Sequence, residues 1–473
     1  MTTPLRRRVS LLVCATLTVV IAFVRPHPTA TLSAQPAATP PPVGSTHPFA
    51  IVGVTVIAMD APGARDHQTI VVRDGRIAAL GPATSTIVPA GVTRIDGRGK
   101  FIVPGLAEMH AHVPGGNAAD ADIARVLELY ALNGVTTARS MLGHTRHLAW
   151  KARAERGEIL SPRIVTSGPS FNGTSVPTRE AAIALVESQK AEGFDFLKIH
   201  PGVANDVFTA LAATADRVGI RFAGHVPLAV GLDRALDLKF ETIDHVDGFV
   251  EALTPPGAAL QATDSQWFGI NLVAQADRSR LAGIVARTRA AGTWIVPTDA
   301  LFVHGSSDVT PEQLAAWPEM RWVAPQQLSA WMENKRTFLA THAPATRRAF
   351  LDLRREVIGA LHRGGVRMLL GSDAPQVWNV PGFATHRELE YMVAAGIPAW
   401  DALAMGTRNV AEFLKRSDTS GTLAVGKRAD LLVLGGNPLA DVTATRKIEG
   451  LAIGGRWITA AERTARLEAL AVR

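Results

Sequence analysis

Two histidines, His110 and His112, stand two residues apart at the end of an apolar stretch, PGLAEMHAH. Alternate residues of a β-strand face the same side, so both imidazoles would point into one space. Imidazole is a common nitrogen ligand for zinc-like ions. The pair alone indicates a metal site only weakly, because two histidines on one face also arise by chance.

Further candidate ligands end four later strand-like stretches: Lys198 in FLKIH, His225 in AGHVP, His245 in IDHVD and Asp373 in GSDAP. Each also has a simpler structural explanation. The lysine can cap a strand end and the aspartate a following helix, and His225 can be a hydrogen-bonded core residue. His245 can pair with Asp244 or Asp247. Their joint occurrence at corresponding strand ends favours a metal site over coincidence.

The stretches that carry these residues belong to a strand–helix alternation that repeats eight times over residues 101–417. Helical patterns such as REAAIALVESQKAEG separate the strands. Eight such units in about 315 residues predict a (β/α)8 TIM barrel, whose chemistry gathers at the carboxyl ends of its strands. Extra helical sequence at 255–345 predicts an insertion around the seventh strand, long enough to cover the barrel mouth.

Short strand-like runs flank the barrel region at both ends of the chain. They lie in residues 48–100, as in FAIVGVTVIAMD, and in residues 418–473, as in SGTLAVGKRADLLVLGGNPL. Alternating apolar residues broken by Asp-Gly and Pro-Gly are typical of short antiparallel strands. We therefore predict a small β-sandwich domain formed by the two terminal segments together.

Residues 1–34 have the pattern of an export signal. Arg6 to Arg8 form a basic start, an apolar run covers residues 9–24, and small polar residues lead to a cleavage site after Ala34. An uncleaved anchor is the alternative, although this run is short for a membrane span. A Pro-rich tether follows at 35–47. We expect an exported protein, periplasmic or secreted, with no stable membrane partner after cleavage.

Composition excludes several classes of protein. Hydrophobic residues make up 47% and charged residues 19%, which supports a large core. The net charge is +7, but four arginines and no acidic residue precede position 35, so the remainder carries +3. No long basic run remains, which argues against a nucleic-acid partner. Cys14 is the only cysteine, so no disulfide is expected within the chain, and a homo-oligomer is compatible with this composition.

Together these motifs resemble the amidohydrolase superfamily, specifically its imidazolonepropionase-like and prolidase-like branch. The similarity covers about residues 48–460, through FIVPGLAEMHAH, GVTTARS, FLKIH, AGHVP, IDHVD, GSDAP and GTLAVGKRADLLVLGGNPL. It implies that His110 and His112 hold one divalent ion and that His225 and His245 hold a second, with zinc the expected metal. It also implies a carbamate on Lys198 that bridges both ions. A carbamate is a bidentate anion, whereas an ammonium has no lone pair to offer.

The resemblance further implies a reaction. Two ions about 3.5–4 Å apart share a hydroxide and polarise a carbonyl. Asp373, both ligand and base, would carry the proton from attacking water to the leaving amine. We expect hydrolysis of a carbonyl–nitrogen bond in a small molecule or short peptide, as in prolidases and dipeptidases. Leu228 stands where deaminases of the superfamily place a glutamate, which disfavours deamination.

Four residues after the strands are candidates for binding a substrate carboxylate: Arg139, His144, His200 and His386. For each of them the favoured explanation is a solvated loop residue or a helix-end charge, and His386 lies in an ordinary helical pattern. Two other functions stay open. One is a lactonase or other ester hydrolase on the same ligands. The other is a non-catalytic metal-binding barrel, which the presence of all six ligand positions disfavours.

Overall fold

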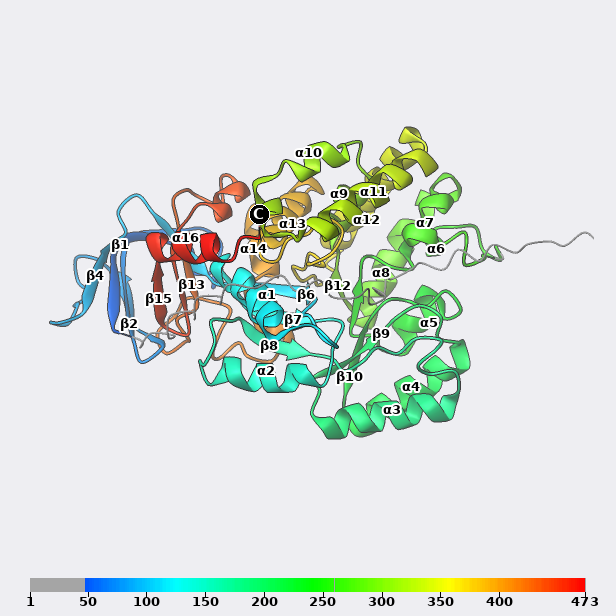
Figure 1. The fold of residues 1–473 in the computed structure, drawn as a ribbon, viewed down its shortest axis with the longest axis horizontal. Helices are drawn as coiled ribbons and strands as arrows, with labels where there is room; N and C mark the ends of the chain where they lie inside the picture. The colour runs from blue at the N-terminus through cyan, green and yellow to red at the C-terminus, as the bar shows by residue number, and fades with distance from the viewer. Residues whose placement is uncertain (1–46, 259, 473) are drawn as a thin grey trace, which may run out of the picture. The chain divides into compact units, whose positions relative to one another are not determined.

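Strands from both ends of the chain form one sheet in the computed structural model, which describes residues 47–258 and 260–472 (Figure 1). The strands are β1 (Phe49–Val56), β2 (Arg65–Arg73), β3 (Arg76–Pro82), β4 (Thr93–Asp96), β5 (Phe101–Pro104), β13 (Leu431–Leu434), β14 (Ile448–Ile453) and β15 (Arg456–Thr459). Their order is β15-β14-β13-β5-β1-β2-β3, and β4 pairs with β1.

The join between the two ends is the antiparallel pair of β5 and β13, in which Val103 lies opposite Leu432. Leu431 and Val433 face an apolar cluster within this sheet, whereas Leu432 and Leu434 belong to the main core. The prediction that both ends complete one β unit agrees with this pairing. The predicted sandwich is not confirmed, because all eight strands belong to one hydrogen-bonded sheet. The rings of Phe49 in β1 and Trp457 in β15 nevertheless lie 5.2 Å apart, so strands distant in the sheet order pack together.

The catalytic region contains two parallel sheets. The first consists of β6 (Leu106–Ala111), β7 (Val135–Ser140) and β8 (Arg163–Thr166). The second consists of β9 (Phe196–Ile199), β10 (Arg221–Gly224), β11 (Thr242–Asp244) and β12 (Trp294–Val296). All of their pairings are parallel, as expected for strands connected by helices.

Isolated parallel bridges link these sheets. Ser167 bridges to Phe196 between β8 and β9. Residues 368–374, where the eighth strand was predicted, bridge to Ile295 of β12 and to Ala111 of β6. The α/β architecture with parallel strands is therefore confirmed. A continuous closed barrel is not formed among the described residues, because the eighth segment contributes single bridges rather than a strand.

Helices follow the parallel strands along the chain: α1 (Asp120–Leu132), α2 (Arg146–Glu155), α3 (Arg179–Glu192), α4 (Asn205–Val218), α5 (Gly231–Asp237), α8 (Leu281–Ala291), α12 (Pro344–Arg363) and α13 (Phe383–Ala394). The boundaries of α3 show why they end where they do. Thr178 accepts a hydrogen bond from the N–H of Ala181 at the amino end, and Gly193 ends the helix at a φ of 90°.

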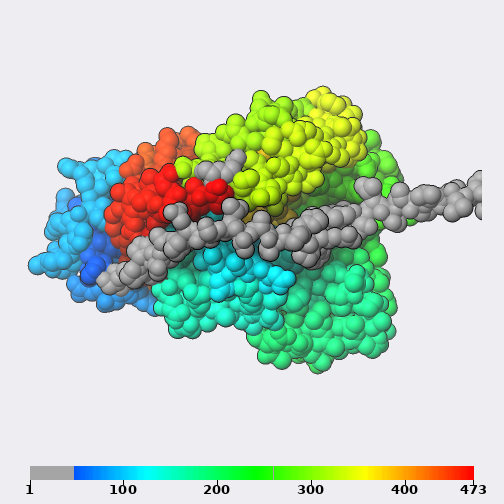
Figure 2. Space-filling model, viewed as in Figure 1, coloured from blue at the N-terminus to red at the C-terminus, as the bar shows by residue number. Residues whose placement is uncertain are grey.

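The predicted insertion is helical and surrounds β12. It contains α7 (Gln266–Gly269), α9 (Asp299–Ser306), α10 (Pro311–Ala315) and α11 (Pro325–Thr341). Its residue Trp322 donates a hydrogen bond to the carbonyl of Leu467 in α16 (Ala460–Ala469), 2.8 Å away. Figure 2 shows this C-terminal helix in red beside the yellow-green insertion. The insertion is therefore fixed to the end of the chain as well as to the strands.

The expected signal at 1–34 and almost all of the tether at 35–47 lie outside the described residues. Within the described part of the chain, no helix has the length and apolar character needed to cross a membrane.

Candidate metal centre

The first and eighth units bring His110, His112 and Asp373 together. The N–H of Asp373 donates to the carbonyl of His110 over 2.9 Å, so these two residues lie side by side. The Oδ1 atom of Asp373 is 2.7 Å from Nε2 of His112 and 3.4 Å from Nε2 of His110. Two imidazole nitrogens from one strand therefore converge on one carboxylate oxygen, as the alternate spacing of the histidines predicted.

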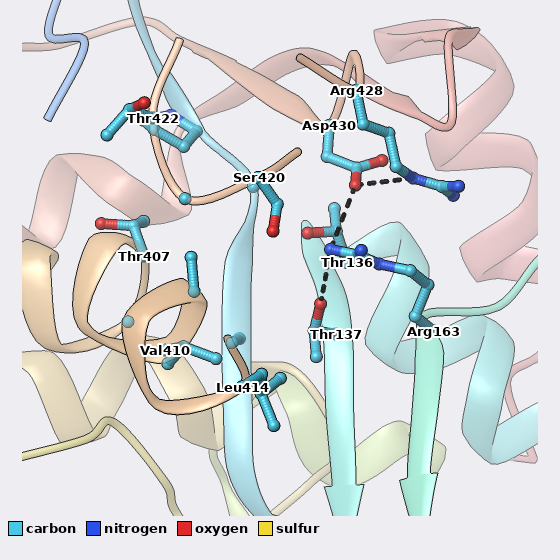
Figure 3. Close-up of a pocket in the computed structure, with 16 residues that line it drawn as sticks. Thr136, Thr137, Arg163, Thr407, Val410, Leu414, Ser420, Thr422, Arg428 and Asp430 are labelled. Atoms are coloured by element: carbon cyan, nitrogen blue, oxygen red, sulfur yellow. Dashed lines mark hydrogen bonds and ion pairs between the residues drawn. The ribbon is translucent and has the colours of Figure 1, made fainter. Parts of the chain in front are cut away.

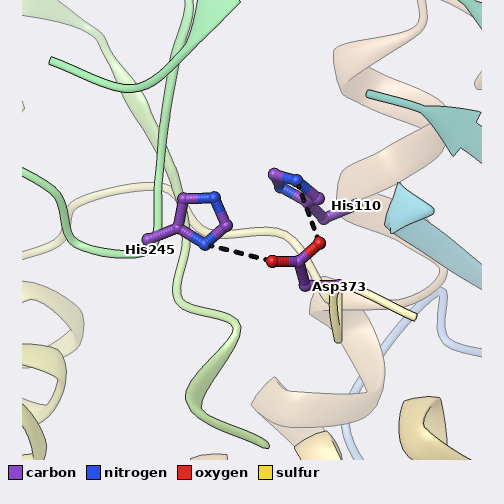
Figure 4. Close-up of side chains that lie close together, drawn as sticks. All are labelled: His110, His245 and Asp373. Carbon is purple, nitrogen blue, oxygen red and sulfur yellow. Dashed lines mark ion pairs between the residues drawn. The ribbon is translucent and has the colours of Figure 1, made fainter. Parts of the chain in front are cut away.

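His245 completes the tightest group of the centre. Its ring centroid is 4.5 Å from that of His110, and its Nδ1 is 3.8 Å from Oδ2 of Asp373. One ligand atom from each of His110, His245 and Asp373 lies within 4.8 Å of the others (Figure 4). All three side chains are about 1% exposed. A set of imidazoles and a carboxylate at this separation can hold a divalent ion.

Lys198 and His225 border this group. The ring of His225 is 4.6 Å from that of His245. The Nζ atom of Lys198 is 3.9 Å from Oδ2 of Asp244, and neither side chain is exposed. All six predicted ligands thus gather in one place, with three of them forming the close set.

Carboxylates and a hydroxyl orient the histidine rings through contacts with their Nδ1 atoms. Nδ1 of His225 lies 3.0 Å from Asp247, and Nδ1 of His245 lies 2.8 Å from the Thr298 hydroxyl. Such contacts fix the ring and leave Nε2 for a ligand role. The sequence offered Asp244 and Asp247 as partners of His245. Asp247 instead contacts His225, and Oδ2 of Asp244 lies 3.1 Å from Nδ1 of His110.

Burial keeps the imidazoles neutral. It lowers the pKa of His110, His225 and His245 well below the ordinary value, and the nearby charge of Lys198 adds to this effect. Burial also lowers the pKa of Lys198 to about 8, against the opposing influence of Asp244 and Asp373. The neutral forms are the ones that can donate a lone pair, to a metal in the histidines and to carbon dioxide in the lysine.

The buried polar atoms of the centre test whether a metal ion fits here. Five of them make no hydrogen bond of acceptable geometry among the described residues: His110 Nδ1, His112 Nε2, Lys198 Nζ, Asp244 Oδ2 and Asp373 Oδ1. They lie close to one another instead, with Nδ1 of His110 3.1 Å from Oδ2 of Asp244 and Nε2 of His112 2.7 Å from Oδ1 of Asp373. A cluster of buried polar atoms without hydrogen bonds calls for a further binding partner. Nitrogen and carboxylate donors suit a zinc-like ion. The residues therefore fit a divalent metal.

Glu108 holds the first and eighth units in register. Its Oε1 accepts the N–H of His110 at 3.0 Å and of Ser372 at 2.7 Å. Its Oε2 accepts the hydroxyls of Ser372 and Thr385, both at 2.7 Å. Sequence reasoning missed this residue, although it precedes His110 by two and so shares its face of the strand. Glu108 thereby positions the proposed ligand His110 and the neighbour of the proposed ligand Asp373.

Arg354, on α12, supports the turn that carries His245. Its guanidinium donates to the carbonyl of His245 at 2.8 Å and to that of Pro297 at 3.1 Å, and it pairs with Asp299 at 2.9 Å. His245 has a φ of 66°, a left-handed conformation that costs about 1–2 kcal/mol in a residue with a side chain. Contacts from a neighbouring helix therefore maintain this strained backbone.

Two of the four candidate substrate ligands are occupied elsewhere. Arg139 is 1% exposed, and its guanidinium donates to the Met109 carbonyl, Thr242 and Asp244. It therefore supports Asp244 rather than a substrate. His386, on α13, is 2% exposed, and its Nε2 lies 2.9 Å from the carbonyl of Asn133 at the end of α1. We assign it to helix packing.

The other two candidates are partly exposed. His144 lies in the loop after β7, where its Nδ1 accepts the N–H of Arg146. His200 follows β9 and stacks on the ring of His225, with centroids 5.0 Å apart. His200 is the candidate that the fold places directly against the proposed ligands.

A small cavity lies at the amino ends of β6, β7 and β8, away from the ligand ends of these strands (Figure 3). Arg163 reaches into it, with Thr137 at 3.2 Å and Asp430 at 3.7 Å. It contains none of the six proposed ligands. We regard it as part of the joint between the terminal sheet and the catalytic region.

Comparison with known proteins connects this geometry to a family. Curated enzymes match the chain only locally. An adenine deaminase of Nitratidesulfovibrio vulgaris is 27% identical over 157 residues, 30% of this chain and 26% of that enzyme. An imidazolonepropionase of Salinispora arenicola is 31% identical over 152 residues, 30% of this chain and 37% of that enzyme. The chain thus spans about a quarter to a third of these relatives.

A solved structure matches over a longer range. A protein of Bifidobacterium longum assigned as a prolidase superposes with a TM-score of 0.63 at 25% identity, covering 90% of this chain and 99% of that one. The model of the Amidohydrolase family matches residues 101–458, which include all six proposed ligands. The chain belongs to the amidohydrolase family.

Proposed function

We propose that this protein is a metal-dependent hydrolase that cleaves a carbonyl–nitrogen bond in a small molecule or short peptide, with prolidase-like or dipeptidase-like activity. The observation that carries the proposal is the convergence of His110, His112 and His245 on the buried carboxylate of Asp373. The prolidase assignment of a protein with the same fold supports the choice of an amide over an ester.

Two divalent ions, with zinc as the expected metal, complete the proposed site. His110 and His112 would hold one ion, and His225 and His245 the other. A carbamate on Lys198 would lie between the two pairs. Bound there, the ions would supply a polarised carbonyl and a water of lowered pKa.

Side chains of the protein carry out proton transfer and contact the substrate. The carboxylate of Asp373 takes up the proton of the attacking water and returns it to the departing nitrogen. Its oxygens lie 2.7 Å from Nε2 of His112 and 3.8 Å from Nδ1 of His245, which keeps it in reach of both ligand pairs. His200, partly exposed against His225, is the first candidate to contact the substrate, with His144 second.

Elemental analysis of metal-loaded protein tests the metal proposal. We expect about two equivalents of divalent ion per chain, because four histidines, an aspartate and a bridging lysine exceed the needs of one tetrahedral ion. A single equivalent would overturn the binuclear site.

A matched substrate panel tests the reaction. It contains Xaa-Pro and other dipeptides, N-acyl amino acids, and lactones of similar size. We expect turnover of amides that a chelator abolishes and added metal restores. Turnover of lactones alone would replace the proposed activity with that of an ester hydrolase.

We also propose that the protein is exported by its first 34 residues. Amino-terminal sequencing of the mature protein should begin after Ala34. A mature chain that retains Arg6 to Arg8 would identify an uncleaved segment instead.

A further inference from the structure

The residues around the proposed metal centre differ in how far their side chains are exposed. His110, His245, Lys198 and Asp373 are completely buried. The side chains of His112 and His225 are 20% and 12% exposed, and His200 and Phe268 are also partly exposed. Three imidazoles and one phenyl ring are therefore the accessible groups among these residues. That ring comes from the insertion.

Phe268 packs directly on the second proposed ligand pair. Its ring centroid is 5.1 Å from that of His245 and 5.7 Å from that of His225, on which it stacks. His200 stacks on His225 as well, 5.0 Å away. The ring of His225 thus has an imidazole neighbour and a phenyl neighbour, which makes one side of the approach polar and the other apolar.

An unusual backbone holds Phe268 in this place. Trp267 and Phe268 both adopt left-handed conformations, with φ of 46° and 56°, and Gly269 follows at 83°. Two such residues with side chains together cost on the order of 2–4 kcal/mol. A Cβ at Gly269 would come within 2.8 Å of Val250, so glycine is required there. Strain of this kind persists only where the surroundings enforce it.

Neighbouring aromatic residues provide this enforcement. The indole N–H of Trp267 donates to the Ser306 hydroxyl over 2.7 Å. Phe302, fully buried, meets Phe268 edge to face at 4.8 Å. Phe338 of α11 contacts Trp267 at 5.2 Å. The insertion therefore positions one partly exposed phenyl ring against the histidines.

We propose that Phe268 is a specificity-determining residue: its ring forms an apolar wall that selects amides with an aliphatic or aromatic side chain next to the scissile bond. This inference rests on the proposed hydrolase function. An apolar group that leaves water against Phe268 gains free energy, whereas glycine gains none there. A polar or charged side chain would be desolvated against the ring without a hydrogen bond in return.

The kinetic test compares Gly-Pro, Ala-Pro, Leu-Pro and Phe-Pro, together with the corresponding N-acetyl amino acids. The wild type should prefer leucine and phenylalanine over glycine in kcat/KM by at least about tenfold, since a methylene group in an apolar pocket is worth 10–200-fold. Phe268→Ala should lower this preference by about tenfold, while Phe268→Leu should keep most of it. Trp317→Ala is the matched control, because it removes a partly exposed aromatic ring of the same insertion that contacts His304 and Arg387 rather than Phe268 or the proposed ligands.

A binding measurement makes the result independent of turnover. Calorimetric titration of the wild type with free L-phenylalanine, L-leucine and glycine should show the weakest binding for glycine, and Phe268→Ala should lose the difference. Equal binding of phenylalanine and glycine by the wild type would contradict the proposed role of Phe268. An unchanged difference between these ligands in Phe268→Ala would contradict it as well. The same loss in Trp317→Ala also contradicts it, because the effect would then reflect general loosening of the insertion. Selective binding without any amide turnover would instead overturn the proposed function and leave the wall intact.

Discussion

Replacement of Glu108 by alanine should destabilise the protein strongly. The carboxylate is unexposed and accepts four hydrogen bonds, two of them from the backbone N–H groups of His110 and Ser372. A backbone N–H cannot turn away, and each unpaired buried donor costs about 1–3 kcal/mol. These two alone predict a loss of about 2–6 kcal/mol, while the hydroxyls of Ser372 and Thr385 can rotate toward other acceptors.

Glu108→Gln is the informative partner variant. Its amide oxygen still accepts both N–H groups, and its NH2 can donate to the two hydroxyls, so we expect a cost below about 2 kcal/mol. Urea denaturation followed by tryptophan fluorescence measures both variants. Metal content should fall with stability in Glu108→Ala, since His110 is a proposed ligand and Ser372 precedes the proposed ligand Asp373. A Glu108→Ala protein within about 1 kcal/mol of wild type, the range of ordinary substitutions, would refute the reasoning.

Three further outcomes are expected. Asp373→Asn should keep most of the metal and lower kcat at least about 100-fold, because an amide cannot take up the proton. His110→Asn, by contrast, should lose metal first. Full turnover in Asp373→Asn would show that another group acts as the base. Lys198→Ala should lose most activity and regain part of it with an added short carboxylic acid; near wild-type turnover and metal content would contradict the carbamate. Burial lowers the pKa of His386 from 6.5 to about 4, so the stability that its neutral ring contributes is present above pH 6.5 and is lost as the pH falls toward 4. His386→Gln should keep kcat/KM. At pH 5 the variant should avoid about 2 kcal/mol of the loss in unfolding free energy that the wild type shows. Parallel curves of stability against pH for the two proteins would contradict this.

Strand periodicity accounts for the placement of some of the proposed ligands but not of all. His110 and His112 share a face because they are two apart, and the parallel arrangement brings the end of the eighth segment beside them. The same rule would place Asp244 and His245 on opposite faces. Both side chains approach the metal centre because the left-handed backbone of His245 interrupts the alternation of side-chain directions along the strand. A periodicity argument contains no information on that conformation.

Side-chain direction was the second obstacle. Arg139 has the residue type and strand-end position of a carboxylate ligand, yet its guanidinium turns inward to Asp244 between the rings of Phe196 and Phe413. The terminal strands were recognised from their alternation, which identifies strands but not their neighbours. Val103 and Leu432 pair across more than three hundred residues of chain, and only tertiary packing decides that contact.

The pairing of β5 with β13 also governs the order in which the protein folds during synthesis. The middle of the terminal sheet stays incomplete until residues 431–434 have left the ribosome, long after β1, β2 and β5. Until then β5 presents an unpaired apolar edge, a feature that promotes association with other chains. A nascent chain that already contains every proposed metal ligand therefore still lacks β13, the strand that covers this edge of β5.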